Sequence, residues 1–270
     1  MPEGDTIRNV AAFLGPRVVG QEIVAAHSRW PSACFALAGR AITRLEPVGK
    51  NLWFVLDDRT AIRVHLGLRG RWRWIERPFS GSVGSVSLAL TFAAGAAVCT
   101  GAPRVERLPA KWLDAPSVDE GPAHPVRRLG PDVLGDTFDP EEVLPRIRRC
   151  GATAAVDVLR DQRVACGIGN VYASEVLFVR GVDPFADPAS LGDEAWRGLY
   201  AEARARMSAN LASGDAADGP RVTAPGTGHR HWVYGREGRP CLRCHTPIEA
   251  RTTGADLPRR TWWCPQCQRG

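Results

Sequence analysis

The sequence predicts an α+β protein in three parts: an N-terminal antiparallel β-sandwich with a leading helix, a helical domain, and a small C-terminal ribbon. Three observations carry this prediction. Short β-rich segments separated by turn residues fill residues 17–116, helical spacing prevails from about 139 to 212, and two Cys-x2-Cys pairs follow. We place the three domains at residues 1–117, 127–220 and 230–270.

The composition excludes several classes of protein. A chain of 270 residues with 44% hydrophobic content is long enough for two or three compact units. No run of ~18 apolar residues occurs, and the first residues lack the pattern of a signal peptide, so we expect a cytoplasmic protein without a membrane span. Four scattered cysteines are typical of buried thiols in a reducing compartment: Cys34, Cys99, Cys150 and Cys166.

The first predicted element is a helix over residues 4–15. Asp5 or Thr6 can cap its start, and an apolar face recurs at helical spacing before Gly15-Pro16 ends it. Met1 precedes a small residue, Pro2, so we expect Met1 to be removed. The exposed proline nitrogen then titrates near ~7.7–8.0, which leaves a useful fraction as a neutral nucleophile. Glu3 follows as a possible proton donor or acceptor; the alternative is that Met-Pro is merely a tolerated start.

The β-sandwich prediction rests on four β-rich segments bounded by Gly, Pro or Asp, at residues 51–57, 61–66, 71–75 and 83–92. Lys50 falls in a predicted hairpin turn, Gly49-Lys50-Asn51. Only Lys50 and Lys111 are lysines, against 33 arginines. Arginine is permanently protonated whereas lysine can transfer a proton, so a retained lysine indicates proton chemistry. The alternative for Lys50 is an ordinary solvated turn residue.

After a predicted linker at residues 117–126, helical spacing occurs at residues 139–149, 152–162, 171–180 and 193–212. Between two of these helices, Gly167 and Gly169 allow a double turn, and Asn170 is placed to cap the next helix. Such a turn offers backbone N–H groups to a phosphate, although an ordinary helix connection fits equally. Residues 213–229 are predicted to be a mobile loop.

The last domain carries the strongest local signal. Cys241 and Cys244, nineteen intervening residues, then Cys264 and Cys267 match the spacing of a structural four-thiolate zinc site. Residues 221–270 hold nine arginines and three acids, which accounts for the whole net charge of +6. A basic ribbon that carries Arg259 and Arg260 in a predicted hairpin indicates a polyanionic partner, most simply nucleic acid.

Taken together, the chain resembles the formamidopyrimidine-DNA glycosylase/endonuclease VIII family of base-excision repair enzymes. Four separated motifs carry the resemblance along the whole chain: Pro2-Glu3-Gly4, Gly49-Lys50, the stretch from Asp161-Gln162 through Gly167-Ile168-Gly169-Asn170 to Glu175, and the ribbon beginning Val233-Tyr234-Gly235-Arg236. The resemblance implies a β-sandwich, a helix–two-turn–helix domain and a zinc ribbon. It also implies damaged DNA as partner, a bacterial monomer, one structural Zn²⁺, and no redox or nucleotide cofactor.

The resemblance also implies residue roles. Pro2 would be the Schiff-base nucleophile, Glu3 a proton donor to the opening sugar, and Lys50 an aid to proton transfer that also holds a phosphate. Arg259 would grip phosphate and aid the second elimination. Further expected DNA contacts are Asn170, Arg128, and the wedge candidate Leu68 with Arg69 beside it. Without the resemblance, Leu68 could equally be a core residue at a strand end. Glu175 matches an acidic position near the nucleophile.

Departures from the family pattern bear on the lesion. The purine-lesion branch carries Arg-Arg-Phe in a second void-filling loop, where this chain has Arg104-Val105-Glu106. The opening Met-Pro-Glu-Gly-Asp-Thr is more similar to the endonuclease VIII branch. We therefore expect a bifunctional glycosylase/AP lyase for oxidised pyrimidines that cuts by β,δ-elimination. Oxidised purines are the alternative substrate, and a lesion-binding protein that does not excise bases is the alternative from another class.

Overall fold

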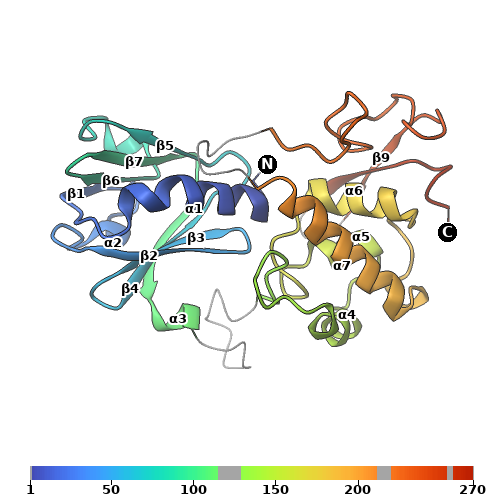
Figure 1. The fold of residues 1–270 in the computed structure, drawn as a ribbon, viewed down its shortest axis with the longest axis horizontal. Coiled ribbons are helices and arrows are strands. Elements are labelled where there is room, and N and C mark those ends of the chain that lie inside the picture. The colour runs from blue at the N-terminus through green and yellow to red at the C-terminus, as the bar shows by residue number, and fades with distance from the viewer. Residues whose placement is uncertain (1, 115–128, 212–219, 254–257, 270) are drawn as a thin grey trace. The chain divides into compact units, whose positions relative to one another are not determined.

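The computed structural model describes residues 2–114, 129–211, 220–253 and 258–269. The chain divides into two compact units, one formed by residues 1–127 with 211–219 and the other by residues 128–210 with 220–270 (Figure 1). Each unit has its own hydrophobic core. The predicted linker at 117–126 lies outside the described residues.

The first unit is built from two four-stranded antiparallel sheets, with strand orders β1-β6-β7-β5 and β2-β3-β4-β8 (Figure 1). Apolar side chains of both sheets enter one core cluster, which confirms the predicted sandwich. The strands are β1 (Ala25–His27), β2 (Ile42–Val48), β3 (Asn51–Leu56), β4 (Thr60–His65), β5 (Arg71–Ile75), β6 (Leu88–Phe92), β7 (Gly95–Thr100) and β8 (Arg104–Pro109).

Helix α1 (Gly4–Val18) leads the sandwich but runs past the predicted end at Gly15-Pro16. Leu14 and Val18 are fully buried in the core, and their burial outweighs the hydrogen bond that Pro16 removes near the helix end. The predicted cap is also wrong: Glu3 is the N-cap, and Thr6 lies at the third helical position.

Two other parts of the first unit differ from prediction. The segment 83–92 is a short 3-10 turn, Val83–Ser85, followed by β6. The unit also contains two one-turn helices, α2 (Pro31–Cys34) and α3 (Lys111–Asp114), neither of which was predicted. Their four-residue length leaves too little periodicity to recognise in a sequence.

The second unit is a helical body to which the ribbon is attached. Its helices are α4 (Leu144–Arg149), α5 (Ala155–Arg160), α6 (Asn170–Arg180) and α7 (Asp193–Ser208), with 3-10 turns at Pro140–Glu142 and Pro188–Ser190. Trp196, Leu199 and Tyr200 of α7 pack with Tyr172 and Val176 of α6 in its core. None of the helices in the described residues is long and apolar enough to cross a membrane.

The ribbon consists of β9 (Glu249–Thr253) and β10 (Arg259–Trp263), paired antiparallel. Arg243, between the first two cysteines, donates hydrogen bonds to the carbonyls of Phe178 and Val179 at the end of α6. Gln268, beyond the last cysteine, accepts from Cys264 N–H and donates to the Val182 carbonyl. The cysteine-bearing turns are therefore docked on the C-terminal end of α6, and the predicted α+β class is confirmed.

Candidate functional site

Pro2 and Glu3 stand at the start of α1. Pro2 is partly buried, whereas Glu3 is 0% exposed. Glu3 and Thr6 form a capping box in which each side chain accepts a backbone N–H of the other residue, with Thr6 Oγ1 3.5 Å from Glu3 N. These contacts hold the buried Glu3 side chain at the start of α1, in the residue directly after Pro2.

Lys50 lies in the two-residue turn between β2 and β3, because Val48 pairs with Asn51. Gly49 takes φ 56°, the left-handed conformation that such a turn requires at its first central position. The predicted hairpin turn is thus confirmed. The turn places Lys50 at one end of a central, fully buried strand rather than in a loose loop.

A histidine that sequence reasoning missed lies beside Lys50. His65 pairs with Asn51 on one side and with Arg104 on the other, so the three form a row across β3, β4 and β8. Burial, and then the charges of Arg63, Lys50 and Arg104, lower the pKa of His65 from 6.5 to about 4. His65 is therefore neutral at pH 7, surrounded by cations that suit an anionic ligand. Only the strand register, which joins residues widely separated in sequence, reveals the row.

The buried side chain of Arg63, also on β4, makes two polar contacts in the same sheet. Its Nε donates to Asn51 Oδ1 at 2.9 Å and its Nη1 donates to Glu106 Oε2 at 3.0 Å. Glu106 belongs to β8, so the stretch Arg104-Val105-Glu106 is an ordered strand rather than a loop. At the position where the resemblance would place an aromatic side chain in the purine-lesion branch, this chain has Glu106, whose carboxylate forms an ion pair with Arg63.

Leu68 and Arg69 lie in the turn between β4 and β5. Leu68 is 72% exposed, so the interpretation of Leu68 as a core residue is wrong. Glycines shape the turn: a Cβ on Gly70 would lie 2.3 Å from the Leu66 carbonyl oxygen, and one on Gly67 would lie 2.7 Å from Pro103 Cγ. The turn is thus tightly folded and presents an apolar side chain to solvent.

In the second unit, the double turn between α5 and α6 is organised by Gln162. Its amide nitrogen donates to the carbonyls of Arg160 and Ile168, and its amide oxygen accepts from Gly167 N–H. Gly169, not Asn170, caps α6. Asn170 is the first helical residue, and its Nδ2 donates to the Arg260 carbonyl at 2.9 Å. The predicted cap is wrong by one residue because the Asn170 side chain bonds the ribbon instead.

That hydrogen bond brings two predicted site regions together, since Arg260 follows Arg259 in β10. Arg259 is partly exposed and pairs with Thr253 across the hairpin. Arg128, the other predicted DNA contact of this unit, lies outside the described residues.

Glu175 is fully buried on α6. Its carboxylate accepts hydrogen bonds from the backbone N–H groups of Trp232, Val233 and Tyr234 at 2.8 to 2.9 Å, and from the Thr223 hydroxyl. Four donors occupy most of the acceptor sites of a carboxylate. Glu175 therefore anchors the segment that leads into the ribbon.

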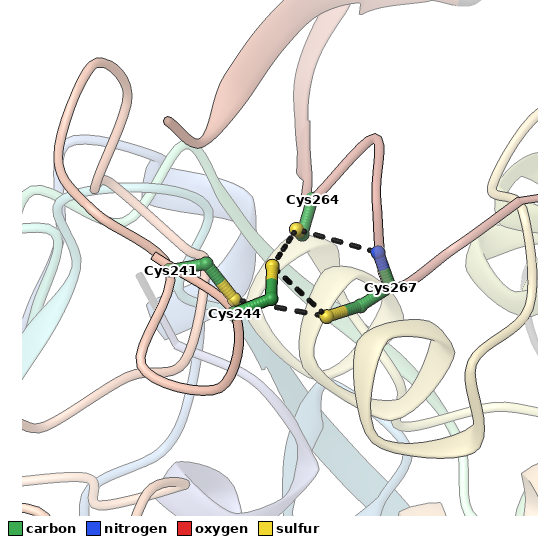
Figure 2. Close-up of side chains that lie close together, drawn as sticks. All are labelled: Cys241, Cys244, Cys264 and Cys267. Atoms are coloured by element: carbon green, nitrogen blue, oxygen red, sulfur yellow. Dashed lines mark hydrogen bonds between the residues drawn. The ribbon is translucent and has the colours of Figure 1, made fainter. Parts of the chain in front are cut away.

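The four clustered cysteines converge on one point (Figure 2). Their sulfur atoms all lie within 4.8 Å of one another, and three separations are 3.4 to 3.9 Å. A tetrahedral ion with Zn–S bonds of ~2.3 Å requires separations of about 3.8 Å, so the cysteines fit such an ion. Backbone N–H groups of Arg243 and Cys267 point at the sulfurs of Cys241 and Cys264. Burial and then the neighbouring thiols raise the pKa of Cys267. A bound cation would favour the thiolate and so lower this pKa.

Two family models match the chain. The formamidopyrimidine-DNA glycosylase N-terminal domain matches residues 1–105, and the formamidopyrimidine-DNA glycosylase H2TH domain matches residues 129–218. The chain belongs to the formamidopyrimidine-DNA glycosylase/endonuclease VIII family. The family predicted from the four motifs is confirmed.

Relatives from both branches of the family are similar to this chain over at least 95% of their own length. "Probable endonuclease 8 2" of Streptomyces coelicolor is 33% identical over 276 residues, which cover 100% of this chain and 95% of that protein. "DNA-(apurinic or apyrimidinic site) lyase Nei2" of Mycolicibacterium smegmatis is 30% identical over 285 residues, 99% of each chain. The crystal structure of the MutM (Fpg) protein from Thermus thermophilus has a TM-score of 0.77 and 28% identity, covering 99% of this chain and 98% of that one. The chain is accordingly a DNA-repair enzyme of the DNA glycosylase and AP lyase class.

Proposed function

We propose that the protein excises an oxidised pyrimidine from DNA through a Schiff base on Pro2 and then cuts the strand by β,δ-elimination. The observation that carries this proposal is the position of Pro2 directly before Glu3, a fully buried residue held in a capping box. A neutral secondary amine and a positioned proton-transfer group are the two groups that iminium formation on a sugar requires.

The proposed sequence of bonds begins after removal of Met1. The Pro2 nitrogen attacks C1′, the damaged base leaves and takes up a proton, and Glu3 protonates the ring oxygen as the sugar opens. The resulting iminium withdraws electrons, so loss of the C2′ proton expels the 3′ phosphate. A second proton loss expels the 5′ phosphate, and water then hydrolyses the iminium to free Pro2. Lys50 assists proton transfer and, with Arg259 in the ribbon, holds the flanking phosphates.

Base removal requires that the nucleotide leave the stack, at a cost of a few kcal/mol. Phosphate contacts offset this cost. For these we propose Lys50 with its cationic neighbours in the first unit, and Asn170, Arg128 and Arg259 in the second. Leu68 is the proposed wedge that fills the void left by the flipped nucleotide, with Arg69 beside it. Its 72% exposure supports this role, because a large apolar side chain in water has a free face.

The choice of pyrimidines rests on Glu106. In place of an aromatic void-filler, β8 carries a carboxylate bonded to Arg63, so this strand has no second apolar wedge. Similarity to proteins named endonuclease 8 supports the same choice. The alternative, excision of oxidised purines, is favoured by the likeness to the Thermus formamidopyrimidine-DNA glycosylase.

We further propose that the ion in the ribbon is one structural Zn²⁺ held by Cys241, Cys244, Cys264 and Cys267. All four positions of a tetrahedral ion are then protein sulfurs, so no position remains for substrate. We expect the enzyme to act as a monomer on damaged DNA without a redox or nucleotide cofactor.

Borohydride trapping tests the nucleophile. Only an iminium is reduced to a covalent protein–DNA adduct, so the wild-type protein should be trapped on an abasic site. Pro2→Gly, and a protein with an uncleaved tag before Pro2, should bind the same DNA but give little adduct. Normal trapping by the tagged protein would overturn the assignment. Absence of any adduct with wild-type protein would favour a lesion-binding protein that does not excise bases. A panel of duplexes with oxidised pyrimidines or purines then decides the lesion class.

A further inference from the structure

Arg160 joins the helical body to both strands of the ribbon. It is the last residue of α5 and is 8% exposed. Its Nη1 donates to Thr253 Oγ1 at 3.0 Å, and its Nη2 donates to Thr261 Oγ1 at 2.7 Å. Thr253 ends β9 and Thr261 is the central residue of β10, so one guanidinium contacts each strand of the hairpin.

The hydrogen bonds continue from Arg160 to Arg259. The hydroxyls of Thr253 and Thr261 are 2.9 Å apart, and Thr253 Oγ1 donates to the Arg259 carbonyl at 3.5 Å. Because each hydroxyl has one proton, Thr261 donates to Thr253 when Thr253 donates to Arg259. The planar guanidinium of Arg160 thus orients a series of hydrogen bonds that runs through both threonine hydroxyls and ends on the Arg259 carbonyl.

The four cysteines cannot hold Arg259 by themselves. Arg259 begins β10, five positions before Cys264, which at ~3.3 Å per residue places it roughly 16 Å along the strand. An isolated two-stranded hairpin is only marginally stable, so its far end requires support from another element. Arg160 supplies that support beside Asn170, whose Nδ2 donates to the neighbouring Arg260 carbonyl.

A buried charge at this place is costly unless its hydrogen bonds are well made. Asp157 Oδ1, 3.4 Å from Arg160 Nη1 and on the same helix, offsets part of the cost. An aliphatic side chain could fill the volume, but it could not orient two hydroxyl groups. The geometry therefore indicates a role in alignment rather than in packing alone.

We propose that Arg160 is a positioning residue that aligns Arg259 with Asn170, so that both reach the phosphates of one DNA strand. This inference rests on the proposed function, in which Arg259 grips phosphate and aids the second elimination. Arg160 is buried against the ribbon, so we assign it no direct contact with DNA. Its effect is confined to the step that Arg259 serves.

Arg160→Met tests this role, because methionine keeps an apolar stem and removes the donors. Zinc content and borohydride trapping through Pro2 should stay at wild-type levels. The ratio of δ- to β-elimination product on abasic DNA should fall by roughly tenfold or more, because the loss of even one of the two hydrogen bonds from the charged guanidinium is on that scale. Arg160→Lys, which keeps the charge and can reach one hydroxyl, should recover part of the ratio. Arg197→Met, a charge-matched change of an exposed ion pair on α7, should resemble wild type.

Thr261→Val supplies an independent variant that leaves Arg160 in place. If the residues act through their hydrogen bond, Thr261→Val lowers the product ratio, and the double variant is little worse than Arg160→Met alone. A wild-type product ratio in Arg160→Met, or a loss of zinc in step with all activities, would overturn the inference. Arg259→Gln separates the two proposals: if it retains δ-elimination, the proposed role of Arg259 fails and the positioning role fails with it. If Arg259→Gln loses δ-elimination while Arg160→Met retains it, the proposed role of Arg259 stands and only the Arg160 inference is wrong.

Discussion

Glu3 and Glu175 are both fully buried carboxylates, and their neighbours give them different tasks. Glu175 is surrounded by four donors from residues 223–234, which commits it to holding a loop. Glu3 lies in a capping box directly after the proposed nucleophile. The sequence shows two acidic residues in family motifs, and only the tertiary structure identifies Glu175 as an anchor for residues 223–234.

Lys50→Arg tests whether the lysine transfers a proton. The change keeps the charge but replaces a titratable ammonium with a guanidinium that stays protonated. We expect cleavage of lesion DNA to slow by roughly 10²–10⁴-fold, as for loss of a general acid–base group. Binding to an uncleavable abasic analogue should change much less. Base removal and strand cutting are assayed separately.

Lys111→Arg is the matched control, because Lys111 is the only other lysine and lies exposed on α3. It should behave like wild type. Near-normal excision and cutting by Lys50→Arg would reduce Lys50 to a phosphate contact.

His65 predicts a pH dependence of stability. Its pKa is about 4 in the folded protein and ~6.5 in the unfolded chain, so between these values the unfolded state binds more protons. The stabilisation is complete above pH 6.5 and is lost as the pH falls towards 4. The test is urea unfolding at pH 7.5 and at pH 5.0. The free energy of unfolding of His65→Gln should fall less between these two pH values than that of wild type, with a difference on the order of 1 kcal/mol. His229→Gln, an exposed histidine, should follow wild type; identical losses for all three proteins would contradict the buried neutral state.

At the scale of elements, turns and strand ends present most of the proposed site. The β2–β3 turn carries Lys50, the β4–β5 turn carries Leu68, the start of α1 carries Glu3, and the start of β10 carries Arg259. Regular strands and helices fix where each turn lies, while glycines such as Gly49 and Gly70 permit its shape. The predicted mobile loop at 213–229 contains no helix or strand in its described part, residues 220–229.

Leu68→Ala tests the wedge. Because Leu68 is 72% exposed, its removal should change stability by no more than about 0.5 kcal/mol. Excision of an oxidised base from duplex DNA should slow, since the void would be unfilled. Cutting at a pre-formed abasic site should slow less, because no base has to leave the stack. Phe35→Ala, an exposed apolar residue elsewhere in the first unit at 77% exposure, is the control. Equal losses on both substrates would argue against a wedge.

At the scale of the whole molecule, the net charge and the four candidate metal ligands are concentrated in one segment of the chain. Residues 221–270 account for the entire net charge of +6, and the same segment contains all four clustered cysteines. The ribbon is attached to the helical body through Arg243, Gln268, Asn170 and Arg160. The proposed DNA contacts of the ribbon would therefore depend on these attachments and on a bound ion to hold the hairpin in place.

Cys244→Ser tests that dependence. The variant should release metal and unfold the ribbon, because small metal ribbons derive their folding energy from the ion. Affinity for DNA should fall with it, as Arg259 loses its support. Cys150→Ser is the control: Cys150 is partly buried, donates to the Ile147 carbonyl, and lies outside the cluster. Full metal content and wild-type affinity in Cys244→Ser would contradict the four-thiolate site.

The sequence alone was sufficient for features whose signal is local. The four cysteines, the sandwich strands and the turn at Lys50 were predicted because spacing, alternation and turn residues act over a few positions. Two predictions were wrong because tertiary contacts overrode a local signal. Burial of Val18 in the core extends α1 past Pro16, and the Asn170 side chain donates to the Arg260 carbonyl of the ribbon instead of capping α6.

Only the tertiary structure decided which distant residues meet. Strand register places His65 between Asn51 and Arg104. Glu106 pairs with Arg63, 43 positions away, and Arg160 donates to Thr261, 101 positions away. No periodicity records such pairs, because they depend on how separately folded segments bury one another's polar groups. Residue types and spacing thus determined the family and its chemistry, whereas burial and register determined which side chains hold that chemistry in position.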